Sequence, residues 1–354
     1  MFRKIPLTIC IFMFSSIAFA QSGRVKPSET PVPNPNPRLV YIPTQTKSQN
    51  PKPNVSPTPP TKSEDEEGDI ISVDSTLVPI PVSVIDESGQ AVTNLKLENF
   101  QLQIDGKAAE ISELSRSDSP VRLALLFDNS SSVTIAREFE KKAAIRFFKR
   151  VLRPDKDLAA LYSVQTGTRL EQPLTKNVSQ LTSAIENFPI PAGATALLDA
   201  IITAADYLKT EQGRRVIVIV SDGEDTISDA TFEDAVKAVQ ADNCQVYVVK
   251  TKDFENFKRT GQRIGNANIR ALSAERRMQE LTAQTGGAVY SPIDEKELDQ
   301  AFNQISAELS QQYILSYYPE NIDKIGQFHD ISLTIKDREN LNIRTRKGYY
   351  VLRK

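Results

Sequence analysis

The sequence predicts an α/β fold: a doubly wound, mostly parallel sheet, flanked by a β-sandwich-like region that N- and C-terminal segments build together. Two observations predict it. Between residues 121 and 309, short apolar runs typical of buried strands alternate with segments whose apolar residues have helical spacing. On both sides of this stretch the sequence returns to the alternating pattern of half-buried strands.

The first twenty residues have the pattern of a secretory signal peptide. Arg3 and Lys4 precede an apolar run, Ile5 to Ile17, and Ala18-Phe19-Ala20 forms a small-x-small cleavage site. We expect a mature chain that begins near Gln21, has no transmembrane segment and is exported to the periplasm, the cell surface or the medium. The alternative is an uncleaved anchor, for which the apolar run is short.

Residues 21–69 are expected to be a Pro-rich disordered linker, because this composition cannot bury enough apolar surface to offset chain entropy. Removal of the signal peptide leaves one cysteine, Cys244, which excludes an internal disulfide and a thiol-based metal site. Its apolar neighbours predict a buried structural thiol. With 43 basic and 45 acidic residues, the composition gives no indication of a nucleic-acid partner.

An N-terminal β region is predicted for residues 70–118, where strand-like runs end in turns such as Asp105-Gly106. The C-terminal β region, residues 309–354, contains three runs rich in Tyr, Ile and Val: Tyr313 to Tyr318, Ile331 to Ile335 and Leu341 to Val351. Each region alone has too few strands for a stable sheet. We therefore expect the two to pair with each other, the alternative being that the C-terminal strands extend the central sheet.

The α/β domain is assigned to residues 119–308. Its predicted strands are 121–127, 158–164, 215–220, 245–250 and 288–290, and its predicted helices are 137–152, 178–188, 196–208, 232–241, 274–285 and 295–309. The β-branched run at 215–220 suits a central strand covered on both faces. Residues 254–268 are the least regular part, and we expect there a basic loop that either shapes partner choice or is simply solvated.

Polar residues follow two of these strands and precede one helix. Asp128-Asn129-Ser130-Ser131-Ser132 follows the first strand, Asp222 follows the strand at 215–220, and Thr195 precedes the helix at 196–208. Taken singly, these residues suit helix caps and turns. Because ligands bind outside the carboxyl ends of strands in such sheets, their joint occurrence favours a metal site of Asp128, Ser130, Ser132, Thr195 and Asp222.

The chemistry of these side chains favours Mg²⁺, with Mn²⁺ or Ca²⁺ as alternatives. Mg²⁺ prefers octahedral oxygen coordination and keeps several waters, so hydroxyl groups and few carboxylates suit it. An ion held by so few charges stays poorly neutralised. We expect it to take a further oxygen from a partner protein that offers a carboxylate.

These residues resemble the metal-ion-dependent adhesion site of von Willebrand factor A domains, which have a Rossmann-like fold. The match consists of D-x-S-x-S at Asp128, Ser130 and Ser132, then Thr195, then Asp222 in Val-Ser-Asp-Gly. The resemblance implies that the hydroxyls are near ligands and that the two aspartates act directly or through water. It also implies that binding is coupled to movement of the last helix, here Glu295 to Leu309.

A second resemblance covers nearly all of the chain after the linker, namely to secreted bacterial proteins related to the same domain. It rests on Val84-Ile85-Asp86, Ile104-Asp105-Gly106-Lys107, Gln312-Tyr313-Ile314-Leu315-Ser316-Tyr317-Tyr318-Pro319 and Arg346-Lys347-Gly348-Tyr349-Tyr350. This family supplies no known ligand.

The sequence predicts a binding protein and no enzyme. Phosphate-loop, nucleophile-elbow, zinc-protease and dinucleotide motifs are missing from it. The one histidine, His329, is expected to be an ordinary surface residue, far from the sheet edge. Two alternatives remain: a structural component of an envelope assembly with an idle metal site, and a metal-dependent phosphatase that uses Asp128 and Asp222.

Overall fold

The structure is a computed structural model, and the residues that it describes all belong to the unit formed by residues 70–354. They are residues 77–87, 91–116, 119–131, 137–262, 269–319, 326–336, 338 and 340–351. The expected signal peptide, the expected linker and Ser132 lie outside the described residues.

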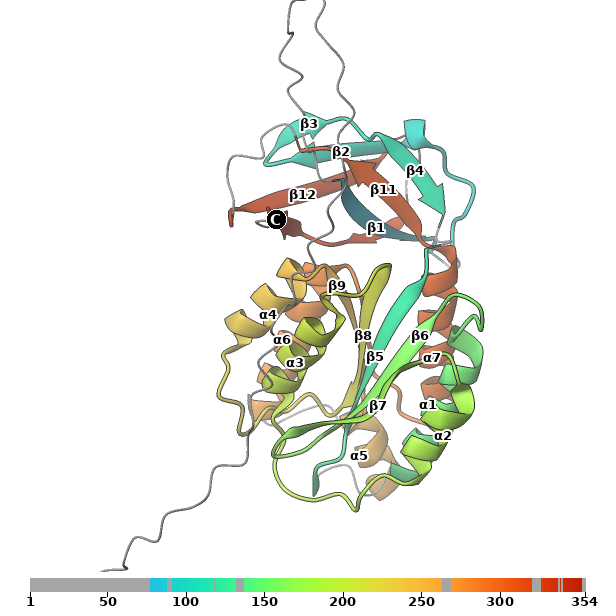
Figure 1. Ribbon diagram of the computed structural model, residues 1–354, viewed down its shortest axis with the longest axis vertical. Helices are drawn as coiled ribbons and strands as arrows, with labels where there is room; N and C mark the ends of the chain where they lie inside the picture. Colours follow the sequence, from blue (N-terminus) through green and yellow to red (C-terminus); the bar gives the residue numbers. More distant parts are fainter. Residues whose placement is uncertain are drawn as a thin grey trace, which may run out of the picture. The chain divides into compact units, whose positions relative to one another are not determined.

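A six-stranded sheet in the order β10-β9-β8-β5-β6-β7 forms the centre of the described α/β domain (Figure 1). Every neighbouring pair is parallel except β6 and β7, which are antiparallel. This confirms the predicted mostly parallel sheet. The strands are β5 (Val121–Asp128), β6 (Leu158–Val164), β7 (Thr168–Thr175), β8 (Arg214–Ser221), β9 (Cys244–Lys250) and β10 (Val289–Tyr290).

Helices cover both faces of this sheet (Figure 1). Alternate residues of β5 point to opposite faces: Leu125 joins a core with α1, α2 and α7, whereas Leu126 joins a core with α3, α4 and α6. Both side chains are fully buried, as expected for a strand covered on two sides. The helices are α1 (Arg137–Val151), α2 (Val178–Glu186), α3 (Leu197–Leu208), α4 (Phe232–Ala241), α5 (Lys252–Thr260), α6 (Ile269–Thr285) and α7 (Glu295–Gln311).

Two elements of the α/β domain differ from the sequence prediction. The expectation of an irregular loop from residue 254 is wrong as far as residue 260, because α5 covers Lys252–Thr260 and buries Phe254. Gly261, with φ 71°, ends this helix in the left-handed conformation that glycine adopts readily. The antiparallel edge strand β7 was not predicted, since its burial does not alternate and it contains Pro173.

Two four-stranded antiparallel sheets form the flanking region. One has the order β13-β1-β11-β4 and the other β14-β12-β2-β3, so each combines N- and C-terminal strands. This confirms the predicted joint β region, and within the described residues the central sheet takes no strand from the C-terminal segment. The elements are β1 (Val78–Ile85), the short 3-10 helix η1 (Leu97–Asn99), β2 (Phe100–Ile104), β3 (Lys107–Ala109), β4 (Glu113–Arg116), β11 (Tyr313–Tyr317), β12 (Phe328–Ile335), β13 (Asn342–Thr345) and β14 (Gly348–Tyr350).

The core of this β region contains side chains from both sheets, among them Ile80, Leu102 and Tyr313. The predicted turn at Asp105-Gly106 joins β2 and β3, with φ of 51° and 75° at its two residues. The run at 341–351 forms two strands, β13 and β14, which belong to different sheets and have Arg346 between them.

Helix α7 connects directly to the β region. It ends at Gln311, β11 begins at Tyr313, and only Gln312 lies between them. The amide of Gln312 donates a hydrogen bond to Ser83 Oγ of β1 at 2.7 Å and accepts one from Arg214, the first residue of β8. The α/β domain and the β region are therefore joined by buried polar contacts.

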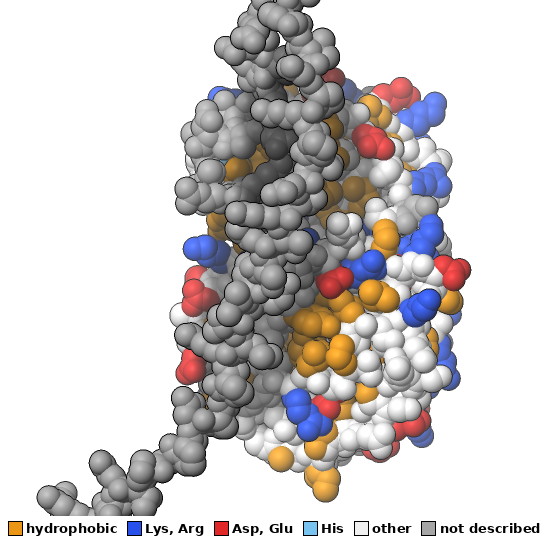
Figure 2. Space-filling model, viewed as in Figure 1, with side chains coloured by type: hydrophobic (Ala, Val, Ile, Leu, Met, Phe, Trp, Pro, Cys, Tyr) orange, Lys and Arg blue, Asp and Glu red, His pale blue; other side chains and the backbone are white. Residues whose placement is uncertain are grey.

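The surface drawn in Figure 2 carries acidic and basic side chains interspersed over its described part, in agreement with the small net charge of −2. Among the described residues, we find no helix with the length and apolar character needed to cross a bilayer.

Candidate functional site

The loop after β5 carries the first candidate residues. Asp128 ends the strand and is buried, with 1% of its surface exposed. One of its carboxylate oxygens accepts a hydrogen bond from the backbone N–H of Ser130 at 2.9 Å, and the other accepts one from the hydroxyl of Ser221 at 2.7 Å. These bonds fix the carboxylate and start the loop. Ser132, the last residue of the predicted motif, lies outside the described residues.

Asp222 follows the neighbouring strand β8, which pairs with β5 in parallel so that Phe127 lies opposite Val220. Both aspartates therefore emerge at the same edge of the sheet. The Asp222 carboxylate accepts the backbone N–H of Glu224 at 3.0 Å, and Lys252 Nζ lies 3.4 Å from its other oxygen. Burial alone would lower the pKa of Lys252, but the negative charges of Asp222 and Glu224 raise it.

Thr195 comes from the loop between α2 and α3 and is buried. Its backbone N–H donates to the hydroxyl of Thr226 at 2.9 Å, and its carbonyl accepts the N–H of Thr226 at 2.9 Å, which ties it to the loop after β8. The N–H of Ser131, in the loop after β5, donates to the carbonyl of Gly193 at 3.3 Å, which joins that loop to the loop containing Thr195. Gly193 is needed there, because its φ is 77° and a Cβ would lie 2.5 Å from the hydroxyl of Thr166.

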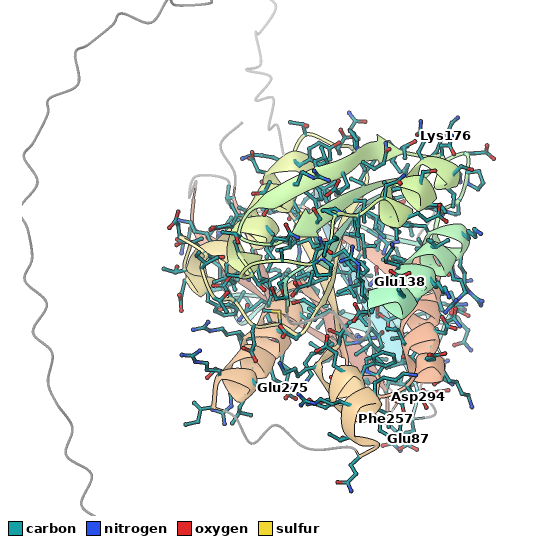
Figure 3. All side chains as sticks on the ribbon, turned by 90° about the horizontal axis from the view of Figure 1, so that it is seen from below. Glu87, Glu138, Lys176, Phe257, Glu275 and Asp294 are labelled. Atoms are coloured by element: carbon teal, nitrogen blue, oxygen red, sulfur yellow. The ribbon has the colours of Figure 1, made fainter. Side chains whose placement is uncertain are left out.

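The three predicted loops thus meet at one edge of the sheet through hydrogen bonds between them. The described candidate residues in these loops are Asp128, Ser130, Thr195 and Asp222, all of them buried. Figure 3 views the chain from this end of the sheet, with α1 marked by Glu138 and α5 marked by Phe257.

Two buried glutamates that the sequence analysis did not select add carboxyl groups to this edge. Burial and then the charge of Asp222 raise the pKa of Asp128 to about 6. Glu140 of α1 is fully buried, and burial followed by the charges of Glu255 and Asp128 raises its pKa well above the ordinary range. Burial and then Asp222 raise the pKa of Glu255, on α5, to about 8. Burial and mutual repulsion therefore favour the protonated forms of Asp128, Glu140 and Glu255.

The donor atoms suit a hard divalent cation. One carboxylate oxygen of Glu140 and one of Glu255 are buried without a hydrogen-bond partner among the described residues. Among the described residues, no three Asp, Glu, His or Cys side chains are grouped closely enough to hold a metal by themselves. A metal at this edge would therefore need the hydroxyl groups of Ser130 and Thr195, or water, beside the aspartates.

His329 lies in the β region, and the expectation of an ordinary surface residue is wrong. It is 8% exposed, and its Nδ1 lies 2.7 Å from Asp105 Oδ2. Its ring stacks on Tyr349 with 5.3 Å between centroids. These contacts give His329 a structural role between β12 and β14, and it takes no part in the edge where Asp128 lies.

The sequence profile described as von Willebrand factor type A domain matches residues 123–224. Solved structures resemble the chain at low identity. The von Willebrand factor type A protein of Catenulispora acidiphila is 11% identical, covers 78% of this chain and 75% of its own, and has a TM-score of 0.43. An aerotolerance-related membrane protein of Bacteroides fragilis is 21% identical. The match covers 52% of this chain and 98% of that protein, with a TM-score of 0.40. The PilB minor pilin of Streptococcus sanguinis is 12% identical, with a TM-score of 0.42. The match covers 58% of this chain and spans 64% of that pilin.

Among curated proteins the chain has no significant match. The matched segment 123–224 contains all five residues of the metal site predicted from the sequence.

Proposed function

We propose that this chain is a metal-dependent protein-binding module, because residues 123–224 match the von Willebrand factor type A domain, whose members generally act as interaction modules. The ion is Mg²⁺ in preference to Mn²⁺ or Ca²⁺. It is held by Asp128, Ser130, Ser132, Thr195 and Asp222. The ion captures a carboxylate of a partner protein. No catalytic step is required.

The observation that carries this proposal is the pair of buried aspartates at the ends of neighbouring strands. Two carboxylates of like sign in a desolvated site are unfavourable unless a cation joins them. Lys252 supplies one positive charge to Asp222, at 3.4 Å, whereas the hydrogen bonds described for Asp128 come from neutral groups, the N–H of Ser130 and the hydroxyl of Ser221. A divalent ion between the aspartates would supply the missing charge.

Exposed apolar side chains beside the site favour a macromolecular partner. Ile190 is 85% exposed, in the loop that also contains Gly193, and Ile227 is 48% exposed, with its N–H bonded to the carbonyl of Thr195. Apolar groups around a polar centre are typical of protein interfaces. They offer little to a small phosphomonoester.

Calorimetry tests the metal site. We expect the mature chain to bind Mg²⁺ or Mn²⁺ at one site, and Asp128→Ala to abolish that binding. Asp206→Ala, at an exposed aspartate of α3, is the matched control and should bind as the wild type does. Unchanged metal binding by Asp128→Ala would show the site assignment to be wrong.

Partner capture tests the use of the metal. The mature chain, immobilised in Mg²⁺, should retain proteins from the native envelope that chelator releases, and Ile190→Ser should retain less of them while binding Mg²⁺ normally. A structural component with an idle site would keep the same partners with and without chelator. Turnover of a general phosphomonoester by the Mg²⁺-loaded chain would instead favour the phosphatase alternative.

Export is part of the proposal. It rests on the small-x-small motif Ala18-Phe19-Ala20, and the secreted bacterial relatives of this domain are the family to which we assign the whole chain. N-terminal sequencing of the protein from the periplasm, the cell surface and the medium should give Gln21 as the first residue. An intact N-terminus on a protein that stays in the membrane would support an uncleaved anchor instead.

A further inference from the structure

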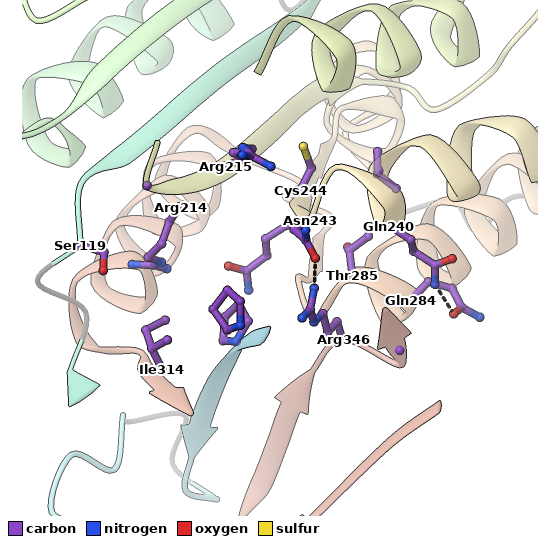
Figure 4. A pocket seen from close by; sticks show the side chains of 16 residues that line it. Ser119, Arg214, Arg215, Gln240, Asn243, Cys244, Gln284, Thr285, Ile314 and Arg346 are labelled. Atoms are coloured by element: carbon purple, nitrogen blue, oxygen red, sulfur yellow. Dashed lines mark hydrogen bonds between the residues drawn. The ribbon is translucent and has the colours of Figure 1, made fainter. Parts of the chain in front are cut away.

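A cavity of about 400 Å³ lies where the α/β domain meets the β region (Figure 4). Its lining includes Arg214, at the start of β8, and Gln245, near the start of β9, together with Arg346 from the segment between β13 and β14. The candidate metal site is at the other end of β8, which has eight residues. At about 3.3 Å per residue, the two ends are roughly 20 Å apart.

The lining of this cavity is basic. Arg214, Arg215 and Arg346 contribute to it, and none of the described residues that line it is an aspartate or a glutamate. Arg214 and Arg215 donate to the neutral carbonyls of Leu309 and Asp242, at 2.6 and 2.7 Å. The whole chain has a net charge of −2, so the positive charge is local to this cavity. It favours the binding of an anion there.

Arg346 gives the cavity a specific donor group. Its side chain is buried, and its Nη1 donates to Asn243 Oδ1 while its guanidinium lies over the ring of Tyr349. Its Nε and Nη2 are buried without a hydrogen-bond partner among the described residues. These two nitrogens form one edge of the planar guanidinium group, the edge that donates two parallel bonds to a carboxylate or a phosphate.

A buried guanidinium with an unused edge is costly, since each unpaired donor loses its hydration without replacement. Burial lowers the pKa of Arg346 to about 10, so the group keeps its charge at neutral pH. An acceptor is also unpaired in the lining: Gln245 donates to the carbonyl of Gly286 at 2.9 Å, whereas its own Oε1 is buried without a partner among the described residues.

We propose that this cavity binds a small hydroxylated organic anion, whose carboxylate or phosphate group pairs with the Nε and Nη2 edge of Arg346 and whose hydroxyl donates to Gln245. The volume is within the range of about 300–1,000 Å³ that is typical of small-molecule sites. Because the cavity is remote from Asp128 and Asp222, binding is independent of the metal. The ligand would also bridge the junction between the α/β domain and the β region.

Calorimetric titration of the mature chain with L-malate and with glycerol 3-phosphate tests the proposal and separates the two anion classes. We expect one-site saturable binding of at least one probe, which Arg346→Gln weakens roughly tenfold or more, because a charge-assisted pair is lost. Arg346→Lys keeps the charge but loses the paired donors, so it should also bind more weakly. Arg169→Gln, at an arginine paired with Glu171 on the edge strand β7, should bind as the wild type does. Chelator and Asp128→Ala should change nothing.

A second measurement covers the case in which Arg346→Gln fails to fold. In the wild-type chain, the Nε–H resonance of Arg346 should shift on titration with the bound probe and follow the calorimetric curve. The proposal is overturned if neither probe binds saturably at millimolar concentration, if the folded Arg346 variants bind like the wild type, or if a high-resolution crystal grown with the probe shows only water in the cavity.

Discussion

Replacing Asp128 with asparagine should stabilise the metal-free protein and at the same time remove its response to Mg²⁺. The substitution keeps the shape of the side chain and its Oδ1 acceptor for the N–H of Ser130. The hydroxyl of Ser221, which donates to Oδ2 at 2.7 Å, can rotate to accept from the new amide instead. The main change is therefore the loss of a buried negative charge.

The size of this effect follows from the raised pKa of Asp128. Folding raises the pKa from an ordinary 3.8 to about 6, so the folded state binds the proton more tightly than the unfolded state does. The free energy of unfolding is therefore highest at a pH below the unfolded pKa of this group. It falls as the pH rises through about 6. At about 1.36 kcal/mol per pKa unit, the ionised group costs the folded, metal-free protein about 3 kcal/mol above that pH. Asparagine avoids this cost.

Urea denaturation, followed by circular dichroism at about pH 8, measures the effect in chelator and in excess Mg²⁺. Above pH 6 in chelator, Asp128→Asn should gain up to about 3 kcal/mol over the wild type. Mg²⁺ at about 100 times its Kd should stabilise the wild type by about 2.7 kcal/mol and the variant by nothing measurable. A less stable metal-free variant, or an equal gain from Mg²⁺ in both proteins, would refute the reasoning.

Asp157→Asn is a control with the opposite sign. Asp157 is also buried, and burial alone would raise its pKa, but hydrogen bonds from Arg153 and from the N–H of Val121 lower it. Its contribution to stability is therefore present above the unfolded pKa and is lost as the pH falls. The same substitution should here destabilise the protein by about 1–3 kcal/mol at neutral pH, with or without Mg²⁺.

Three further predictions concern the cores. Phe147→Ala removes a ring that is 1% exposed and whose centroid lies 4.8 Å from that of Phe302. It should lower the free energy of unfolding, measured in urea, by about 3–5 kcal/mol, and a loss below about 1 kcal/mol would contradict this packing. Tyr313→Phe leaves the buried N–H of Leu95 without its acceptor and should cost about 1–3 kcal/mol by the same assay, an unchanged midpoint being the contrary result. Burial raises the pKa of Cys244 to about 12, so a thiol reagent should react with it only in denaturant, and rapid labelling of the native chain would disagree.

The parallel part of the central sheet could be predicted because its strands contain buried apolar runs and the helices between them are amphipathic. The run at residues 215–220 can be a strand only where both faces are covered, as they are in β8. Helix α5 could not be predicted in this way. Its only apolar residues are Phe254 and Phe257, and Glu255 is buried beside Phe254, so the helical pattern is short and tertiary contacts decide its structure.

The site was predictable where the sequence concentrates polar groups just after strands, as at Asp128 and Asp222. Glu140 and Glu255 carry no such signal, because glutamates on helices are usually solvated and only the fold buries them beside the aspartates. His329 shows the same limit. Its neighbours in the sequence, Phe328 and Asp330, do not indicate that Asp105 from a distant strand pairs with it.

The single residue between α7 and β11 restricts how the last helix can move. A slide of one helical turn is about 5.4 Å, which exceeds the advance of about 3.4 Å per residue along a strand. Since β11 is paired on both sides, with β1 and with β4, such a slide would shear two ladders of backbone hydrogen bonds at once. A larger movement of α7 must therefore move the β region together with the helix. Ligand binding that shifts α7 would then also have to supply the free energy for displacing the β region.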